Sequence, residues 1–205
     1  MRITSAAKED RRQRILDAAV EQFQLKGFDA ATTRDIARQA RIASGTIFNY
    51  FTTKEAILAN LAAEALARGR ADFARKSIEG DLEENLFALV AAELRQLKPL
   101  RKFLRPLIET ALSPLAAADR CEAGDSFRFE HLEIVCKIAG QQGLGELSAV
   151  ALQMYWALYL GVLAFWATDK SPKQEDTLAL LDESLAMFVA WLRNSLPPTS
   201  MKGET

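Results

Sequence analysis

The sequence predicts an all-α protein: a three-helix helix-turn-helix domain joined by a long helix to a larger helical bundle. Apolar residues recur at helical spacing through most of the 205-residue chain, and no stretch alternates polar and apolar residues as a half-buried strand does. Glycine and proline fall between these periodic segments, where helices end. We expect the helix-turn-helix domain at 8–53, the bundle at 54–195 and a flexible tail at 196–205.

Charge is unevenly distributed along the chain. Residues 1–54 carry ten Lys and Arg against six Asp and Glu, a net charge of +4, whereas the whole chain has a net charge of −1. This asymmetry indicates a basic surface at one end of the molecule.

The first helix is expected from Lys8 to Lys26, because Ile15 and Phe23 recur on one helical face. Gly27 follows it and can adopt the left-handed conformation that ends helices. Phe28 would then pack back on Phe23.

Two short helices come next. The second helix begins at Thr32, which has capping-box spacing to Asp35, and ends near Arg41. The third covers about Ser44 to Phe51, with the sequence SGTIFNYF. Ile47 faces the first two helices, so the short polar side chains of this segment are left on its outer side.

A long helix opens at Thr52-Thr53-Lys54-Glu55, which repeats the capping-box pattern, and continues to about Ile78. Further helical segments, each separated from the next by proline or glycine, are expected at 81–97, 100–112, 126–142 and 146–168.

The last helix opens with Ser171 at the N-cap, proline at the first helical position and Gln174 at N3. It carries an apolar stripe that is either ordinary core or a contact with a second chain. Because the apolar helix of 146–168 also needs covering, we favour a homodimer formed by two helices from each copy. The residues expected at this interface are Leu152, Leu163, Leu178, Leu181, Leu185, Phe188 and Leu192.

Residues 149–167, AVALQMYWALYLGVLAFWA, are apolar over a length that could span a bilayer. Tyr155, Trp156 and Tyr159 lie in the middle, whereas membrane helices concentrate such residues at their ends. A helix that is apolar all round can instead be buried in protein. We therefore favour burial over a membrane-associated protein.

No catalytic motif is recognisable: the sequence lacks G-x-S-x-G, H-E-x-x-H, a P-loop and G-x-G-x-x-G. The single histidine, His131, cannot build a multi-histidine metal site. Cys121 and Cys136 form no C-x-x-C pair, and no apolar segment behind the charged N-terminus resembles a secretory signal. We expect no enzyme activity, no metal, no cofactor and a cytoplasmic location.

The two short helices have the layout of a helix-turn-helix, in which the second helix enters the major groove of DNA. Ser44, Thr46, Asn49 and Tyr50 remain outward, and Gly45 allows close backbone approach. Short polar groups at a helix start suit phosphate oxygens and base edges, and asparagine can form two hydrogen bonds with adenine.

Residues 14–58, RILDAAVEQFQLKGFDAATTRDIARQARIASGTIFNYFTTKEAIL, resemble the N-terminal domain of tetracycline-repressor (TetR) type regulators. The resemblance lies in ILDAA…F…KGF, TTRDIA, GTIFNYF and KEAIL. It implies an all-helical C-terminal domain that forms homodimers through its last two helices and holds a small effector.

The resemblance also implies roles for individual residues. Thr33 would touch a phosphate, and Arg34 would reach a base, most simply guanine. Tyr50 and Lys54 would hold phosphates. The residues that would meet bases or backbone in the groove are Ser44, Gly45, Thr46 and Asn49.

Three positions differ from the family pattern. Arg41 stands at the usual glycine of the turn, where a left-handed non-glycine residue costs about 1–2 kcal/mol; either the turn differs or Arg41 adds a phosphate contact. Ala43 stands at the frequent serine cap, which leaves Ser44 to cap one residue later. Phe48 replaces a common tyrosine of the DNA-facing set and lacks its hydroxyl.

The effector pocket is expected among aromatic residues of the larger domain, although such residues more often form core. His131 is either a satisfied buried histidine or a hydrogen-bonding group of this pocket. The candidate lining residues are Phe87, Phe103, His131, Trp156 and Tyr159.

These observations predict a dimeric transcription regulator, most simply a repressor released from a palindromic DNA operator by a small apolar or amphipathic effector. Two alternatives remain: a helical adaptor that binds protein through its leucine stripe, and a transcriptional activator on the same fold.

Overall fold

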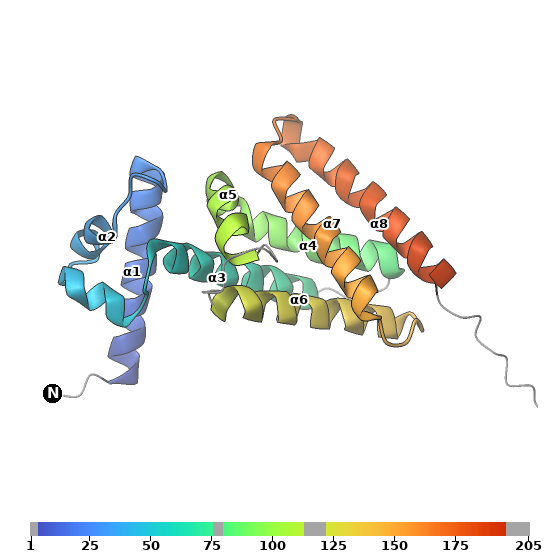
Figure 1. Cartoon of the computed structure of the whole chain (residues 1–205), viewed down its shortest axis with the longest axis horizontal. Helices are drawn as coiled ribbons and strands as arrows, with labels where there is room; N and C mark the ends of the chain where they lie inside the picture. Colours follow the sequence, from blue (N-terminus) through green and yellow to red (C-terminus); the bar gives the residue numbers. More distant parts are fainter. Residues whose placement is uncertain (1–3, 76–79, 113–121, 196–205) are drawn as a thin grey trace, which may run out of the picture. The chain divides into compact units, whose positions relative to one another are not determined.

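The computed structural model describes residues 4–75, 80–112 and 122–195, and these are helical with turns and no strand (Figure 1). The predicted all-α class is confirmed. The expected tail at 196–205, the predicted helix end at Ile78 and Cys121 lie outside the described residues.

The chain divides into two compact units. The first unit comprises Met1–Ala65 and Arg105–Asp125, and the second comprises Leu66–Leu104 and Ser126–Thr205. The predicted domain limits at 53/54 and 195/196 stay predictions.

The first unit contains α1 (Ser5–Lys26), α2 (Thr33–Gln39), the 3-10 helix η1 (Ser44–Asn49) and the start of α3 (Lys54–Ala74). Their core consists of side chains at most 4% exposed: Ile15, Phe23, Ile36, Ile47 and Phe51.

Local signals hold these elements in place. Gly27 ends α1 with φ +81°, and its N–H donates to the Phe23 carbonyl at 2.9 Å. The rings of Phe23 and Phe28 then lie 5.1 Å apart, as predicted. Thr32 caps α2, and its reciprocal hydrogen bonds with Asp35 confirm the capping box.

The third helix begins at Ser44 as predicted, but other details of the helix ends and caps are wrong. Thr53, not Thr52, caps α3, because its Oγ1 accepts from the Ala56 N–H at 3.0 Å. The third helix is a 3-10 helix that ends at Asn49. Ala43, at its N-cap, supplies no side-chain hydrogen bond, so the expected capping by Ser44 is also wrong.

The second unit packs α4 (Leu82–Leu97) and α7 (Ala149–Thr168) against α8 (Glu175–Ser195), with α6 (Glu122–Gln141) and the later turns of α3 completing its helices. Asp81 caps α4 with a reciprocal bond to Glu84. Ser148 caps α7.

The segment predicted as one helix at 100–112 is instead three short pieces. These are the 3-10 helix η2 (Lys98–Phe103), α5 (Leu104–Leu107) and the π-helical η3 (Ile108–Leu112). Prolines at 99 and 106 lack the N–H that a regular helix needs, which interrupts the α-helical ladder here.

The capping box predicted for the last helix does not form, because a short 3-10 turn η4 (Pro172–Gln174) precedes α8 and Lys173 and Gln174 have φ near +54° and +59°. Asp169 binds this junction instead. Its carboxylate accepts from the Ser171 N–H at 2.7 Å and from the Thr177 N–H at 3.1 Å.

Most side chains of the apolar stripe predicted at the dimer interface are buried within one chain, and the interface itself stays a prediction. Five side chains are at most 3% exposed within one chain, so no second copy can cover them: Leu163, Leu181, Leu185, Phe188 and Leu192. They pack α7 and α8 against each other and α8 against α4. Leu152 is half-buried, and Leu178 is 39% exposed.

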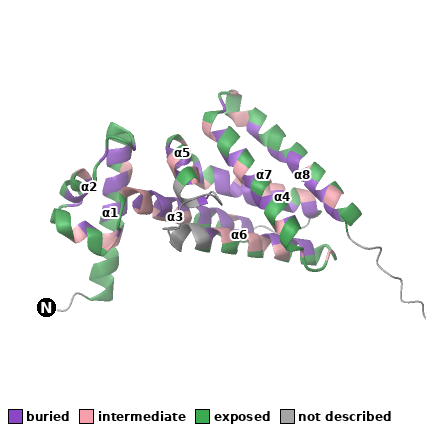
Figure 2. Ribbon diagram, in the orientation of Figure 1, coloured by how far each residue is buried: buried purple, intermediate pink, exposed green. Residues whose placement is uncertain are grey.

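Helices α7 and α8 also carry exposed residues (Figure 2), and these include the apolar Val150, Phe165 and Met187. Helix α7 has the length and hydropathy of a membrane span, with a mean hydropathy of 1.5 and 39% of that window buried. One buried face and one exposed apolar face account for its composition without a bilayer.

Candidate DNA-binding surface and effector site

The start of α2 exposes the first candidate DNA contacts. Thr33 is half-buried and Arg34 is exposed, with no partner for Arg34 among the described residues. Asp35 is engaged, because its carboxylate binds Lys26 at 2.9 Å and Arg38 at 2.7 Å. The hydrogen bonds from Lys26 and Thr32 hold the pKa of Asp35 well below its usual value. Arg34 is therefore the arginine of α2 that is free to reach a base.

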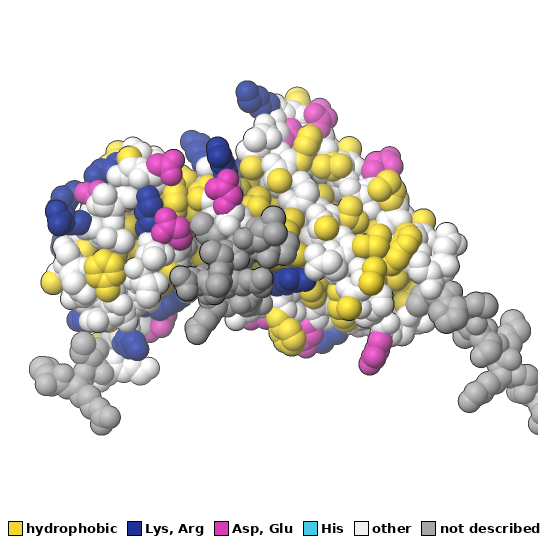
Figure 3. Space-filling model, viewed as in Figure 1, with side chains coloured by type: hydrophobic (Ala, Val, Ile, Leu, Met, Phe, Trp, Pro, Cys, Tyr) yellow, Lys and Arg dark blue, Asp and Glu magenta, His cyan; other side chains and the backbone are white. Residues whose placement is uncertain are grey.

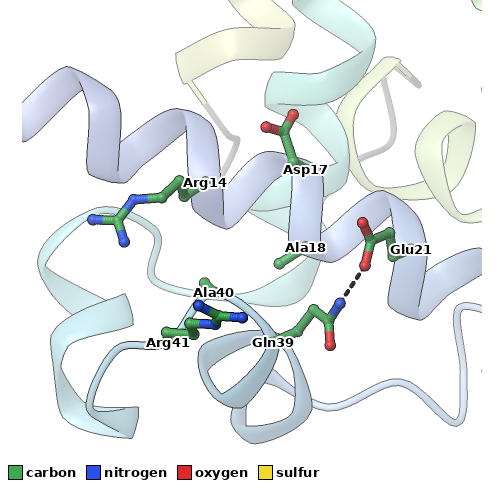
Figure 4. A pocket seen from close by; sticks show the side chains of 7 residues that line it. All are labelled: Arg14, Asp17, Ala18, Glu21, Gln39, Ala40 and Arg41. Atoms are coloured by element: carbon green, nitrogen blue, oxygen red, sulfur yellow. Dashed lines mark hydrogen bonds between the residues drawn. The ribbon is translucent and has the colours of Figure 1, made fainter.

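The turn between α2 and η1 keeps the left-handed conformation without glycine. Arg41 has φ +56°, and the following Ile42 N–H donates to the Ala37 carbonyl at 3.0 Å. The Arg41 side chain points over an open hollow of about 300 Å³ beside α1, with Arg14 on the other side and Gln39 hydrogen-bonded to Glu21 (Figure 4).

Helix η1 presents a polar outer face with one aromatic residue. Ile47 is fully buried, whereas Phe48 is 54% exposed. Thr46 and Tyr50 are half-buried, and a Cβ at Gly45 would meet no atom within 4 Å. The remaining two candidates, Ser44 and Asn49, are exposed. The structure thus brings the predicted groove residues onto one six-residue element and the turn after it.

Lys54 has partners that the sequence did not reveal. Its Nζ donates to the carbonyls of Phe28 and Asp29 at 2.9 and 3.0 Å, with Ala31 at 3.4 Å, and lies 4.6 Å from the Phe28 ring centroid. Each ammonium hydrogen therefore has a carbonyl in reach. Contact with a phosphate, which stays a prediction, would have to replace one of them.

Two arginines of α1 form ion pairs. Arg12 binds Glu64 at 2.7 Å and Asn60 at 3.0 Å on α3, and Arg14 binds Asp10 at 3.2 Å. Arg12 therefore fixes α1 to the first turns of α3.

Three of the five predicted pocket residues meet in the second unit. The His131 ring lies 4.5 Å from Tyr159 and 6.1 Å from Trp156, centroid to centroid. Phe87 is half-buried on α4, and Phe103 is buried in η2.

A buried hydrogen-bond network runs through His131. Glu93 Oε1 lies 3.0 Å from Nδ1 and accepts its hydrogen, and Tyr155 Oη lies 3.0 Å from Nε2. The Tyr159 hydroxyl donates to Glu93 Oε2 at 3.0 Å. Burial, together with the Glu93 carboxylate, raises the pKa of both tyrosines well above its usual value.

Sequence reasoning missed Glu93, which is 0% exposed. A signal was present, because Glu93 follows Leu86, Leu89 and Val90 on the apolar face of α4 and precedes Leu97 there. A charged residue inside such a stripe is buried only with partners.

A cavity in the second unit lies next to Tyr155 and Tyr159. Its volume is about 10 Å³, which is room for about one water. An effector larger than that requires the helices or side chains here to move.

Comparison with known proteins agrees with this architecture. The sequence profile of bacterial regulatory proteins of the tetR family matches residues 15–61. The HTH-type transcriptional regulator YvkB of Bacillus subtilis (strain 168), named as uncharacterized, is 32% identical over 94 residues, 45% of this chain and 48% of that protein. The N-terminal domain of this chain, over residues 15–61, thus matches the TetR family.

A second relative is the HTH-type transcriptional repressor KstR of Rhodococcus jostii (strain RHA1). It is 35% identical over 66 residues, 32% of this chain and 31% of that protein. The chain thus spans about half or less of the length of these curated relatives.

Solved TetR-family structures share the fold over most of the chain. The regulator from Nitrosomonas europaea ATCC 19718 aligns with a TM-score of 0.67 at 24% identity, covering 88% of this chain and 98% of that one. FadR from Thermus thermophilus, in complex with lauroyl-CoA, aligns with a TM-score of 0.66 at 24% identity, covering 95% and 99%.

Proposed function

We propose that this TetR-family chain is a homodimeric transcription regulator that binds a palindromic operator and is released from it by a small effector. The observation that carries the proposal is the exposed polar face of η1 next to the free Arg34 at the start of α2. Short polar groups and an unpaired arginine, exposed on a helix-turn-helix, suit base edges and phosphates.

In this proposal Asn49 and Arg34 read bases, while Thr33, Ser44, Thr46 and Tyr50 hold the backbone. The main-chain approach at Gly45 is unobstructed. Lys and Arg side chains project from the surface of the first unit (Figure 3). Such positive charges favour binding of a polyanion such as DNA.

The dimer interface is proposed on the outer faces of α7 and α8, where hydrophobic side chains gather (Figure 3). Six large apolar residues there are at least 36% exposed: Val150, Met154, Phe165, Leu178, Leu180 and Met187. Uncovered apolar side chains on two adjacent helices are typical of a four-helix dimer contact.

Helix α3 is the element through which an effector would act. It begins at Lys54, shortly after η1, and ends at Ala74 among the helices of the second unit. A dimer must hold its two reading elements about 34–36 Å apart to meet successive major grooves. An effector that binds one position of α3 more tightly than another would change that spacing and weaken operator binding.

Repression is the favoured outcome of operator binding, since KstR is named a repressor, and activation is the alternative on the same fold. The Bacillus subtilis FadR structure, at 23% identity, holds stearoyl-CoA, so acyl-CoA thioesters belong in an effector screen. A cytoplasmic location accompanies this function.

The test is binding of the full chain to DNA from immediately upstream of its own gene, across a salt series, against a scrambled duplex. We expect specific binding whose logarithm falls with the logarithm of salt concentration by about 0.9 per neutralised phosphate. Asn49→Ala and Arg34→Ala should each weaken it by about 1–3 kcal/mol and relax base preference.

Arg95→Ala, an exposed arginine of α4, is the matched control and should bind as the wild type does. Weak binding that is equal on both duplexes, and on duplexes selected from the whole genome, would contradict the proposed regulator. It would favour the alternative, an adaptor that binds protein.

A further inference from the structure

Arg70 on α3 is a buried arginine with an unused donor. It is 8% exposed, and its Nη2 binds the Glu130 carboxylate. Its Nη1 lies 3.7 Å from Glu93 Oε1, too far for a hydrogen bond, and has no hydrogen-bond acceptor. The charge of Arg70 is therefore balanced by two carboxylates, but its Nη1 amino group has no hydrogen-bond acceptor.

Trp156 on α7 is the second such donor. Its side chain is 1% exposed, and its indole Nε1 has no hydrogen-bond partner. Buried donors without acceptors are rare in folded proteins and call for an explanation, such as an absent ligand.

Both residues border one ring, that of Phe127 on α6. The Arg70 guanidinium carbon lies 5.3 Å from its centroid, and the Trp156 ring lies 5.7 Å from it. His131 and Tyr159 lie 5.7 and 6.0 Å away. The Phe127 ring is 2% exposed and makes a cation–π contact with Arg70, but it supplies no hydrogen-bond acceptor to Arg70 Nη1 or Trp156 Nε1.

We propose that the space filled by the Phe127 ring is a closed effector site, in which this ring stands where a neutral ligand with a flat apolar body and a carbonyl oxygen would bind. The body would replace the ring against Trp156, His131 and Tyr159, and the oxygen would accept from Arg70 Nη1 and Trp156 Nε1. The inference rests on the proposed effector response, because it names the ligand class of that response.

The charges of Arg70 and Glu93 beside this space favour a neutral ligand over a charged one. A carboxylate at Arg70 Nη1 would lie beside the Glu93 carboxylate, 3.7 Å from the same nitrogen, and like charges at such distances repel strongly in a buried site. A cation would lie beside the guanidinium. Glu93, moreover, already accepts from His131 and Tyr159, so the groups left without partners are donors.

The same site touches α3 through its backbone. A Cβ added at Gly69 would lie 2.7 Å from the Glu93 Cα, so α3 and α4 are in main-chain contact beside Arg70. A ligand oxygen that draws Arg70 away from Glu93 therefore acts on the helix that begins at Lys54.

The experiment uses four probes of similar size: acetophenone, ethylbenzene, benzoate and benzylamine. Phe127→Ala opens the space, as deletion of a core ring leaves a cavity that binds small aromatic molecules. We expect acetophenone to raise the Tm of this variant most, ethylbenzene less, and the two ions least. The wild type should show the same order with smaller shifts.

Adding Arg70→Met or Trp156→Phe to Phe127→Ala should remove the advantage of acetophenone over ethylbenzene while the ethylbenzene shift persists. Trp166→Phe is the matched control, since Trp166 is a buried tryptophan of α7 beside Arg101. Phe127→Leu replaces Phe127→Ala if the latter does not fold.

Equal shifts with acetophenone and ethylbenzene, a larger shift with either ion, or no shift with any probe would overturn the proposal. The readout contains no DNA, so failure of operator binding leaves this result unaffected, and the two failures are distinguishable.

Discussion

Arg41 combines an unfavourable backbone conformation with an exposed guanidinium. Its φ of +56° lies in the left-handed region, which costs a non-glycine residue about 1–2 kcal/mol. Its side chain is exposed and has no partner among the described residues. A residue that destabilises the turn yet leaves its charge free is typical of a position selected for a contact outside the chain.

We expect Arg41→Gly to raise the free energy of unfolding by up to about 1 kcal/mol, since glycine relieves the strain but gains freedom in the unfolded chain. Arg41→Ala is the control, because it removes the charge and keeps the strain; no gain is expected. Denaturant titration measures both. Equal stability of Arg41→Gly and Arg41→Ala would contradict the strain argument.

Phe48 is exposed on an otherwise polar reading element, where an aromatic ring suits the methyl group of thymine. We expect Phe48→Ala to weaken operator binding. We also expect the binding of this variant to be insensitive to the methyl group of one operator thymine that the wild type recognises. Replacing each operator thymine by uracil, which removes only the methyl, measures this. Wild-type binding that is insensitive to every such replacement would contradict it.

Single residues also mark the limit of what the sequence predicts. The exposure of Ser44, Phe48 and Asn49 follows from burial of Ile47 and could be predicted from spacing. The carbonyl partners of Lys54 could not, because they come from a loop more than twenty residues away. Side-chain partners distant in sequence depend on tertiary packing, which periodicity does not encode.

At the scale of elements, helix order was predictable wherever a cap or a periodic stripe is present, as at Thr32. Predictions failed where the chain departs from regular geometry. Prolines interrupt 100–112, and two positive φ values reshape the start of α8. The apolar stripe of α8 was recognised, but periodicity alone cannot say whether a helix face meets its own chain or a second copy.

The junction of α7 and α8 depends on the charge of Asp169. Hydrogen bonds from Thr177 and Ser171 lower its pKa to about 2. A carboxylate with a depressed folded-state pKa stabilises the fold above its unfolded pKa of about 4, and that stability is lost as pH falls toward 2. Asp169→Asn should therefore lower the Tm at pH 7, and the difference from the wild type should shrink at low pH.

Thermal unfolding at pH 7, 4 and 2.5 measures the effect, with Asp182→Asn on the exposed face of α8 as the control. A Tm difference for Asp169→Asn that stays constant over this range would show that the hydrogen-bond geometry, not the charge, holds the junction.

At the scale of the whole molecule, operator binding and dimerisation are linked in the proposed function, because two reading elements must meet two half-sites. The outer face of α7 and α8 supplies the uncovered apolar surface, with Val150 63% and Met187 65% exposed. Neither residue belongs to the candidate DNA contacts or to the buried network around Glu93. A charge introduced there therefore tests assembly alone.

We expect Met187→Asp combined with Val150→Asp to convert the dimer into a folded monomer, since unpaired charges cannot be buried at an apolar interface without a large desolvation cost. Operator affinity should fall at least 100-fold, roughly the loss expected when one half-site replaces two. Sedimentation and DNA binding measure the two effects, and circular dichroism verifies the fold. Phe129→Asp, at an equally exposed apolar residue of α6, should leave both unchanged. If the double variant stays dimeric, the interface does not lie on these two helices. If it is monomeric and binds the operator as tightly as the wild type, DNA recognition does not depend on dimerisation.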